Sequence, residues 1–332
     1  MKRQTIAGAA ALVLILLTSV WNTAVRGSIL DAGERCLTVL IPSLYFYSLL
    51  AAFCIRSDGL RYVSRLFRKN GLLWGIVLFS QIGGYPVGAQ LLHELEVSGV
   101  ISQHQKNRML CVCFGCGPGF LLGTVCRGLP ARLCLWMMLS VILPNLLLAP
   151  FFLRGIEPGE TVHPSVPLTH QITQAAESAA NAMLKVTAMI LAFAACMGIL
   201  DGMGAFSLLP ERWAVLVRSV LEVSSITELL PAGGSLPMAA ACLSFGGSCV
   251  HLQTEAICGA PDWGKFLLIR AASAIMSYGI CTLGVRYLFR EIVPASLCVT
   301  EPQLTTGSML PGACLLVMSV MLLRRSDRSA LL

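Results

Sequence analysis

The feature that most constrains this chain is a series of long segments without a charged side chain. Seven windows of 18 or more residues lack Asp, Glu, Lys and Arg: 4–25, 36–55, 70–93, 109–126, 133–153, 229–254 and 302–323. A helix needs about 20 apolar residues to cross the hydrocarbon core of a bilayer, so each window could form a membrane segment. Two shorter windows, 186–200 and 271–285, are expected to span as well, because apolar residues continue past their flanking charges.

Composition supports the same interpretation. Charged residues make up 12% of the chain and hydrophobic residues 56%, whereas a soluble domain has about 25% charged residues. So few charges could hardly cover the surface of a soluble protein of 332 residues. The sequence therefore predicts an all-α, polytopic membrane protein with about eight to nine hydrophobic segments. Residues 1–332 are expected to form a single integral membrane domain.

Basic residues set the expected orientation. Lys2 and Arg3 precede the first window, which predicts a multi-pass protein with a cytoplasmic N-terminus. A second basic cluster follows two windows later and consists of Arg56, Arg61, Arg65, Arg68 and Lys69. We expect this cluster to contact anionic membrane lipid as a surface helix, and a solvated loop explains it equally well. Because the bases flank apolar runs, the net charge of +7 predicts lipid rather than nucleic acid as a partner.

Two segments have the pattern of amphipathic rather than spanning helices. In 213–230 and in 169–185, apolar side chains recur with the i, i+3, i+4, i+7 spacing of one helix face. The stretch 154–167 contains three prolines and several charges, so it is predicted to be a loop between two halves of the chain, 36–153 and 168–291. Segment 302–323 is the expected C-terminal hydrophobic segment.

Three glycine clusters interrupt the apolar windows. They are Gly83-Gly84-Tyr85-Pro86-Val87-Gly88, Gly115-Cys116-Gly117-Pro118-Gly119 and Gly246-Gly247-Ser248. Such clusters are expected to stop a helix. In membrane transporters, broken helices expose backbone groups to solutes and ions near the middle of the bilayer. Close packing of helices through small residues is the alternative, and it explains the second cluster poorly.

Polar side chains lie in the same windows, where each needs a partner or a cavity. Gln81 and Tyr85 belong to the first break, and His251, Gln253 and Glu255 follow the third. His251 is interpreted either as a hydrogen-bonded structural histidine or as a proton carrier.

A further polar patch contains Glu222, Ser224, Ser225, Thr227 and Glu228 between apolar flanks. Glu222 could carry a charge inside a cavity. A surface pair with Arg218, four residues earlier, is an equally good interpretation.

The two halves share a short pattern. Cys111, Phe114 and Gly115 have the same Cys-x-x-Phe-Gly spacing as Cys242, Phe245 and Gly246. Each copy opens a glycine break and follows another polar or broken segment. The matching order of elements indicates an internal repeat, which is common in secondary transporters.

These motifs resemble those of a known family. The runs that carry the resemblance are Gly84-Tyr85-Pro86-Val87-Gly88-Ala89, Phe114-Gly115-Cys116-Gly117-Pro118-Gly119 with the residues to Val125, and Gly246-Gly247-Ser248-Cys249-Val250-His251-Leu252-Gln253. They are similar to the sporulation integral membrane protein family of the YlbJ type, over roughly residues 41–289. The resemblance implies two Gate-like nucleoside-recognition repeats, 36–153 and 168–291, with broken or re-entrant helices. It also implies an inverted-repeat plan like that of nucleoside permeases, and the cytoplasmic membrane of a spore-forming bacterium.

Cysteines and enzyme motifs add no chemistry to this interpretation. Cys111, Cys113 and Cys116 lie in an apolar window and lack the paired CxxC spacing of thiolate metal sites, so we expect no metal or other cofactor. No GxSxG, HExxH or Walker motif is present, so we expect no catalytic residues.

The preferred hypothesis is a permease-like transporter of a small polar solute, either nucleoside-like or a small carboxylate, with a coupling ion. The expected substrate-binding residues are Gln81, Tyr85, Gly115, Gly117, Gly119, Glu222, Ser224, Gly246, Gly247, Ser248, His251 and Gln253. The alternative is a non-transporting membrane scaffold that recruits spore-envelope assembly factors through its basic and amphipathic segments. A membrane enzyme acting on lipid-linked precursors is a weaker third option. The sequence leaves open whether the chain forms a homo-oligomer.

Overall fold

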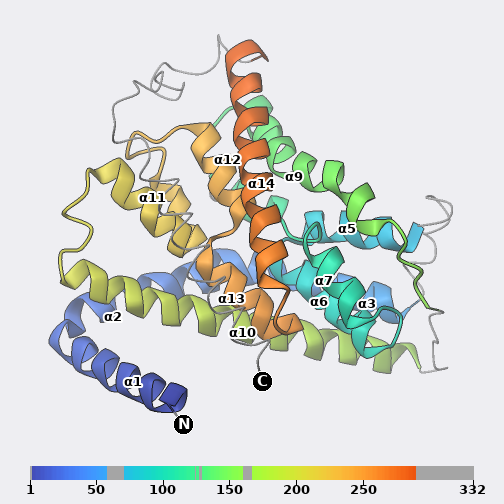
Figure 1. Ribbon diagram of the computed structural model, residues 1–332, viewed down its shortest axis with the longest axis horizontal. Coiled ribbons are helices and arrows are strands. Elements are labelled where there is room, and N and C mark those ends of the chain that lie inside the picture. Colours follow the sequence, from blue (N-terminus) through green and yellow to red (C-terminus); the bar gives the residue numbers. More distant parts are fainter. Residues whose placement is uncertain (1, 58–70, 124, 127–128, 160–166, 289–332) are drawn as a thin grey trace.

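The computed structural model describes residues 2–57, 71–123, 125–126, 129–159 and 167–288 (Figure 1). These residues form helices and connecting turns without any strand, so the predicted all-α class is confirmed for them. The helices of the first half are α1 (Lys2–Val20), α2 (Asn22–Arg35), η1 (Cys36–Leu40), α3 (Ile41–Arg56), α5 (Gly71–Gly83), α6 (Tyr85–Val97), α7 (Gln103–Leu110), α8 (Pro118–Gly123) and α9 (Ala131–Leu153). Those of the second half are α10 (Leu168–Gly202), α11 (Glu211–Leu221), η3 (Val223–Glu228), α12 (Leu236–Phe245), α13 (Gly247–Cys258), α14 (Trp263–Leu283) and η4 (Gly284–Leu288).

Local sequence signals explain where several helices begin. Ser102 and Gln105 form a reciprocal capping box at the start of α7. The Ser235 side chain accepts a hydrogen bond from the amide of Met238 at the start of α12. Pro130, Pro167 and Pro210 precede α9, α10 and α11, where a residue without an amide hydrogen removes none of the helical bonds.

Three of the described helices could span a membrane by their length and composition. Ala131–Leu153, Leu168–Gly202 and Trp263–Leu288 are long and apolar enough to cross a bilayer. A fourth span is formed if Gly8–Val20 and Asn22–Leu40 count as one broken segment, bent by 96°. These helices are compatible with a membrane location.

Two sequence predictions about helix limits are wrong. The amphipathic segment 169–185 and the apolar window 186–200 are one continuous helix, α10, whose 35 residues extend about 52 Å. No glycine or proline interrupts the chain from Leu168 to Met197, so nothing stops the helix between them. The helix expected over 213–230 ends earlier, at Leu221, because Glu222 has extended backbone angles (φ −136°, ψ 112°) and separates α11 from η3.

Some predicted segments lie outside the described residues. They are the basic residues of the cluster after Arg56, half of the loop 154–167 (residues 160–166), and the C-terminal hydrophobic segment 302–323.

The helices pack around one main hydrophobic core. In Figure 1, α10 runs along one side of the molecule, where it packs against α2 and α3, and α14 crosses its direction. Helix α14 packs against α9 and α12, and α13 packs against α6 and α10. This arrangement places the short, broken helices between the long ones.

Candidate functional site

Each predicted glycine cluster coincides with a helix boundary. Gly84, between α5 and α6, has a φ of +88°, and Gly246, between α12 and α13, has a φ of +93°. Side chains strongly disfavour these backbone angles, so glycine is required for both breaks. At the middle cluster, α7 ends at Leu110 and α8 begins at Pro118, and residues 114–117 between them are not helical.

The three breaks meet at one place in the molecule. A Cβ atom added to Gly117 would lie 3.0 Å from the amide nitrogen of Gly84, so the backbones of the first two breaks are in direct contact. The third break joins them because a Cβ atom on Gly246 would lie 2.5 Å from the Phe114 ring. The Tyr85 hydroxyl also donates a hydrogen bond to the Leu243 carbonyl of α12. Segments more than 150 residues apart in the chain are thus brought together.

Buried side chains satisfy the carbonyl groups that the middle break removes from helical bonding. Gln81 donates to the Val112 carbonyl over 3.0 Å, and Asn145 donates to the Phe114 carbonyl over 2.9 Å. Asn145 also donates to the Gln81 side chain over 3.0 Å. Buried backbone groups need such partners, and lipid supplies none.

Arg270, in the middle of α14, completes this network. Its guanidinium donates to the carbonyls of Cys111 and Phe114, the latter over 2.9 Å, and to the Asn145 side chain over 3.0 Å. It also lies 5.1 Å from the centre of the Phe114 ring, a cation–π distance. Arg270 is fully buried and forms no ion pair with a carboxylate among the described residues. Backbone and amide oxygens therefore stabilise its charge.

His251 lies in an aromatic cluster on the other side of Phe114. One ring nitrogen, Nε2, is 2.8 Å from the Phe245 carbonyl, and the ring contacts Phe114, Phe245 and Phe266. The other nitrogen, Nδ1, is buried without a hydrogen-bond partner. This geometry fits the structural interpretation of His251, because the side chain faces packed rings.

Glu222 is buried at the junction of α11 and η3, with 6% of its surface exposed. Both carboxylate oxygens lie 3.1 Å from the backbone nitrogen of Ser224, and the Ser224 hydroxyl donates to the same carboxylate. Among the described residues no Lys, Arg or His forms an ion pair with Glu222. The predicted surface pair with Arg218 is wrong, because Arg218 pairs with Asp201 instead.

A small cavity of about 30 Å³ lies where Glu222 approaches the breaks. Five predicted site residues line it: Tyr85, Gly117, Glu222, Ser224 and Gln253. The rest of the lining includes Gly84, Pro86 and apolar side chains of α3, α10 and α13. We call this cavity the central pocket. Its volume suffices for about one water molecule.

The other predicted site residues surround the central pocket without lining it. Gln81 and Gly115 belong to the hydrogen-bonded network, since a Cβ atom on Gly115 would lie 2.5 Å from Oε1 of Gln81. Gly119 is in the first turn of α8, and Gly246, Gly247 and Ser248 form the break and first turn of α13. His251 belongs to the aromatic cluster.

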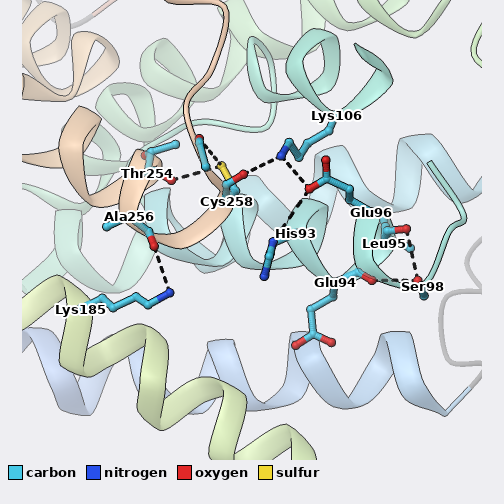
Figure 2. Close-up of polar contacts among 11 residues, drawn as sticks. His93, Glu94, Leu95, Glu96, Ser98, Lys106, Lys185, Thr254, Ala256 and Cys258 are labelled. Carbon is cyan, nitrogen blue, oxygen red and sulfur yellow. Dashed lines mark hydrogen bonds and ion pairs between the residues drawn. The ribbon is translucent and has the colours of Figure 1, made fainter. Parts of the chain in front are cut away.

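The C-terminal end of α13 is fixed by two lysines (Figure 2). Lys106, from α7, donates to the Cys258 carbonyl over 2.6 Å and pairs with Glu96 over 2.7 Å. Lys185, from α10, donates to the Ala256 carbonyl over 3.0 Å. Positive charge at a helix C-terminus offsets the partial negative charge of its free carbonyls. The lysines hold one end of α13, while its N-terminal end adjoins the junction that carries Glu222.

Most of the described cysteines are buried, whereas Cys196 is exposed. Cys111, Cys113 and Cys116 are buried as free thiols near the middle break. No group of three or more His, Cys, Asp or Glu side chains in the described part of the chain is placed to hold a metal ion.

Arg270 and Asn145 are the main residues that sequence reasoning missed. Asn145 is a polar residue inside the charge-free window 133–153, and that position alone could have marked it. Arg270 directly precedes the window 271–285, and the sequence alone shows it only as a charge that flanks this window. In the structure it lies within the longer apolar helix Trp263–Leu288.

Comparisons with models of protein families, with curated proteins and with solved structures find no match to this chain.

Proposed function

We propose that this protein is a permease-like membrane transporter of a small polar solute, and that the central pocket is its solute site. One observation carries the proposal: three broken segments from distant parts of the sequence meet beside a buried carboxylate, Glu222, that forms no ion pair among the described residues. A buried carboxylate is costly, and ionisable groups inside membrane proteins commonly mark ligand or ion sites.

The groups around the central pocket suit a polar solute. Helices α6 and α13 begin beside it, and the amides of a first helical turn favour carbonyl or anionic groups. Glu222 and Gln253 offer acceptors to hydroxyl or amino groups. Glu222 is also the group best placed to carry the coupling charge. Since the pocket has the volume of about one water molecule, solute binding requires the surrounding segments to separate.

The order of elements supports a repeat. Helices α3, α5, α6, α7, α8 and α9 of the first half correspond in order to α10, α11, η3, α12, α13 and α14 of the second. Corresponding elements also meet, since α3 packs against α10 and α9 against α14. Phe114 and Phe245, which occupy matching positions in the two Cys-x-x-Phe-Gly motifs, both contact His251. We propose that the two halves are Gate-like repeats related by inversion.

The biological setting is proposed from the motif resemblance and the basic residues. They favour a multi-pass protein of a bacterial cytoplasmic membrane, with a cytoplasmic N-terminus and a role in sporulation. The experiment below tests the transport activity separately from this setting.

Uptake into proteoliposomes is the direct test. Nucleosides, small carboxylates and small amines would be supplied outside vesicles containing the purified protein. We expect uptake of at least one class, and a loss of about tenfold or more in Glu222→Gln, which keeps the side-chain shape and removes the charge. Glu177→Gln is the matched control, because Glu177 is exposed on α10. No uptake of any solute by folded protein, in both directions of a pH or sodium gradient, would contradict the transporter and favour the scaffold.

A further inference from the structure

A second, larger cavity shares the element η3 with the central pocket. It has a volume of about 600 Å³ and is open to solvent among the described residues. We call it the outer cavity. Its wall includes Asp201 at the end of α10, Arg218 on α11 and Thr227 and Glu228 on η3. A volume of this size is typical of small-molecule sites.

Helix α10 contacts the end of α13, the central pocket and the outer cavity, in this order along its length. Lys185 binds the end of α13, Val186 and Ile190 line the central pocket, and Asp201 lines the outer cavity. From Lys185 to Asp201 the helix rises about 24 Å. The outer cavity therefore lies at the C-terminal end of α10, about 24 Å along the helix from Lys185, and the pocket-lining residues Val186 and Ile190 lie between them.

A single turn of 3₁₀-helix separates the two cavities. Ser224 lines the central pocket, whereas Thr227 and Glu228, in the same element η3, line the outer cavity. Three residues of 3₁₀-helix rise about 6 Å. At one end of the turn, the Ser224 amide donates a hydrogen bond to the Glu222 carboxylate. At the other end, Arg218 forms an ion pair with Glu228 over 4.0 Å.

The charged side chains that line the outer cavity carry a net negative charge. Three carboxylates, Asp201, Glu211 and Glu228, face one guanidinium, Arg218. Arg218 pairs with Asp201 and lies 4.6 Å from the centre of the Phe206 ring. Asp201 and Glu228 expose 37% and 52% of their side chains, so their charges reach the solvent in the cavity.

We propose that the outer cavity is the vestibule through which solute reaches the central pocket. The element η3 is the wall between the two cavities, and it moves to let the solute pass. The excess of carboxylates in the vestibule selects neutral or cationic solutes over anionic ones. This inference rests on the proposed transport function. It narrows the solute class, because it disfavours the small carboxylates.

The test uses single cysteines in a variant whose native cysteines are replaced. Thr227→Cys would be treated, in purified protein, with two methanethiosulfonate reagents, one carrying a trimethylammonium group and the other a sulfonate. We expect the cationic reagent to react about tenfold faster than the anionic one, relative to the reagents' rates with a free thiol. The matched control is Thr173→Cys, an exposed threonine near the other end of α10, where we expect no such preference. Neutralising the cavity with Asp201→Asn and Glu228→Gln should remove the preference.

Uptake measurements complete the test. Modification of Thr227→Cys should block transport, whereas modification of Thr173→Cys should not. Ala232→Cys, also in the cavity wall, replaces Thr227→Cys if that variant does not fold. Any of three results would overturn the proposed vestibule. They are equal reaction with both reagents, failure of both cavity cysteines to react, and undiminished uptake after modification. Charge-selective labelling without uptake of any solute would instead overturn the transport function and, with it, the vestibule's role, while leaving the cavity's charge selectivity established.

Discussion

The contact between Gly246 and Phe114 holds two of the three breaks together, and a single methyl group tests it. In Gly246→Ala, the added Cβ atom would lie 2.5 Å and 2.6 Å from two atoms of the Phe114 ring. Phe114 is fully buried, so the ring cannot move without disturbing its neighbours Tyr85, His251 and Phe266.

The expected loss of stability has two parts. An alanine at a φ of +93° costs about 1–2 kcal/mol of backbone strain, offset by about 0.4–1 kcal/mol because alanine restricts the unfolded chain. Forcing a methyl group into a packed core costs a further 1–3 kcal/mol or so. The sum is about 1–5 kcal/mol, with a central value of about 3 kcal/mol, which for a chain of 332 residues corresponds to a fall in melting temperature of about 4 °C.

Gly233→Ala isolates the strain, because Gly233 has a φ of +78° and nothing within 4 Å of an added Cβ atom. Its expected cost is about 1 kcal/mol, or about 1–2 °C. Thermal unfolding of both purified variants, followed by the loss of monodisperse protein in detergent, measures the difference. Equal falls in melting temperature would refute the close contact between the third break and Phe114.

Three further predictions concern other parts of the same arrangement. Asn145→Leu should cost about 2–4 kcal/mol in thermal unfolding because Gln81 and Arg270 lose a buried partner, whereas Asn181→Leu, at an exposed position of α10, should cost less than about 0.5 kcal/mol. Lys106→Met should cost about 3 kcal/mol, because Glu96 loses its ion pair and the Cys258 carbonyl loses its donor. A loss no larger than that of Lys265→Met, which removes the exposed pair with Asp262, would contradict the role of this buried lysine. Tyr85→Phe should lower stability by about 1 kcal/mol through loss of the bond to Leu243, with Tyr47→Phe as the exposed control, and indistinguishable melting curves for the two would show that the bond contributes nothing.

The sequence predicts local structure well where one residue type has a strong physical effect. Positive φ angles at Gly84 and Gly246 are accessible mainly to glycine, so the break positions could be recognised from the glycine clusters. The all-α class could be predicted because the charge-free windows are long enough to cross a membrane, where a helix satisfies all of its own backbone hydrogen bonds. Charges are a weaker guide, because Lys185 ends the predicted amphipathic segment 169–185 but lies within α10, from which it donates to the Ala256 carbonyl.

The composition of the site depends on contacts between distant residues, which a single sequence does not specify. Glu222 and Gln253 could be chosen as polar residues in apolar surroundings, yet nothing local indicates that they share a pocket with Tyr85 and Gly117. The role of Arg270 is also non-local, since its partners are the carbonyls of a segment more than 150 residues away. Arginine next to an apolar window usually marks the membrane surface, and only the fold shows it buried.

The central claim is that the central pocket becomes hydrated and accessible, and thiol reactivity measures this directly. Val250 lines the pocket and Val141 lies in the packed part of α9, and both are buried. In a variant without native cysteines, reconstituted in proteoliposomes, Val250→Cys should react with a small water-soluble thiol reagent at least about tenfold faster than Val141→Cys. Equal and negligible reaction at both positions would mean that the broken helices enclose a permanently packed core, and the transport account would be wrong.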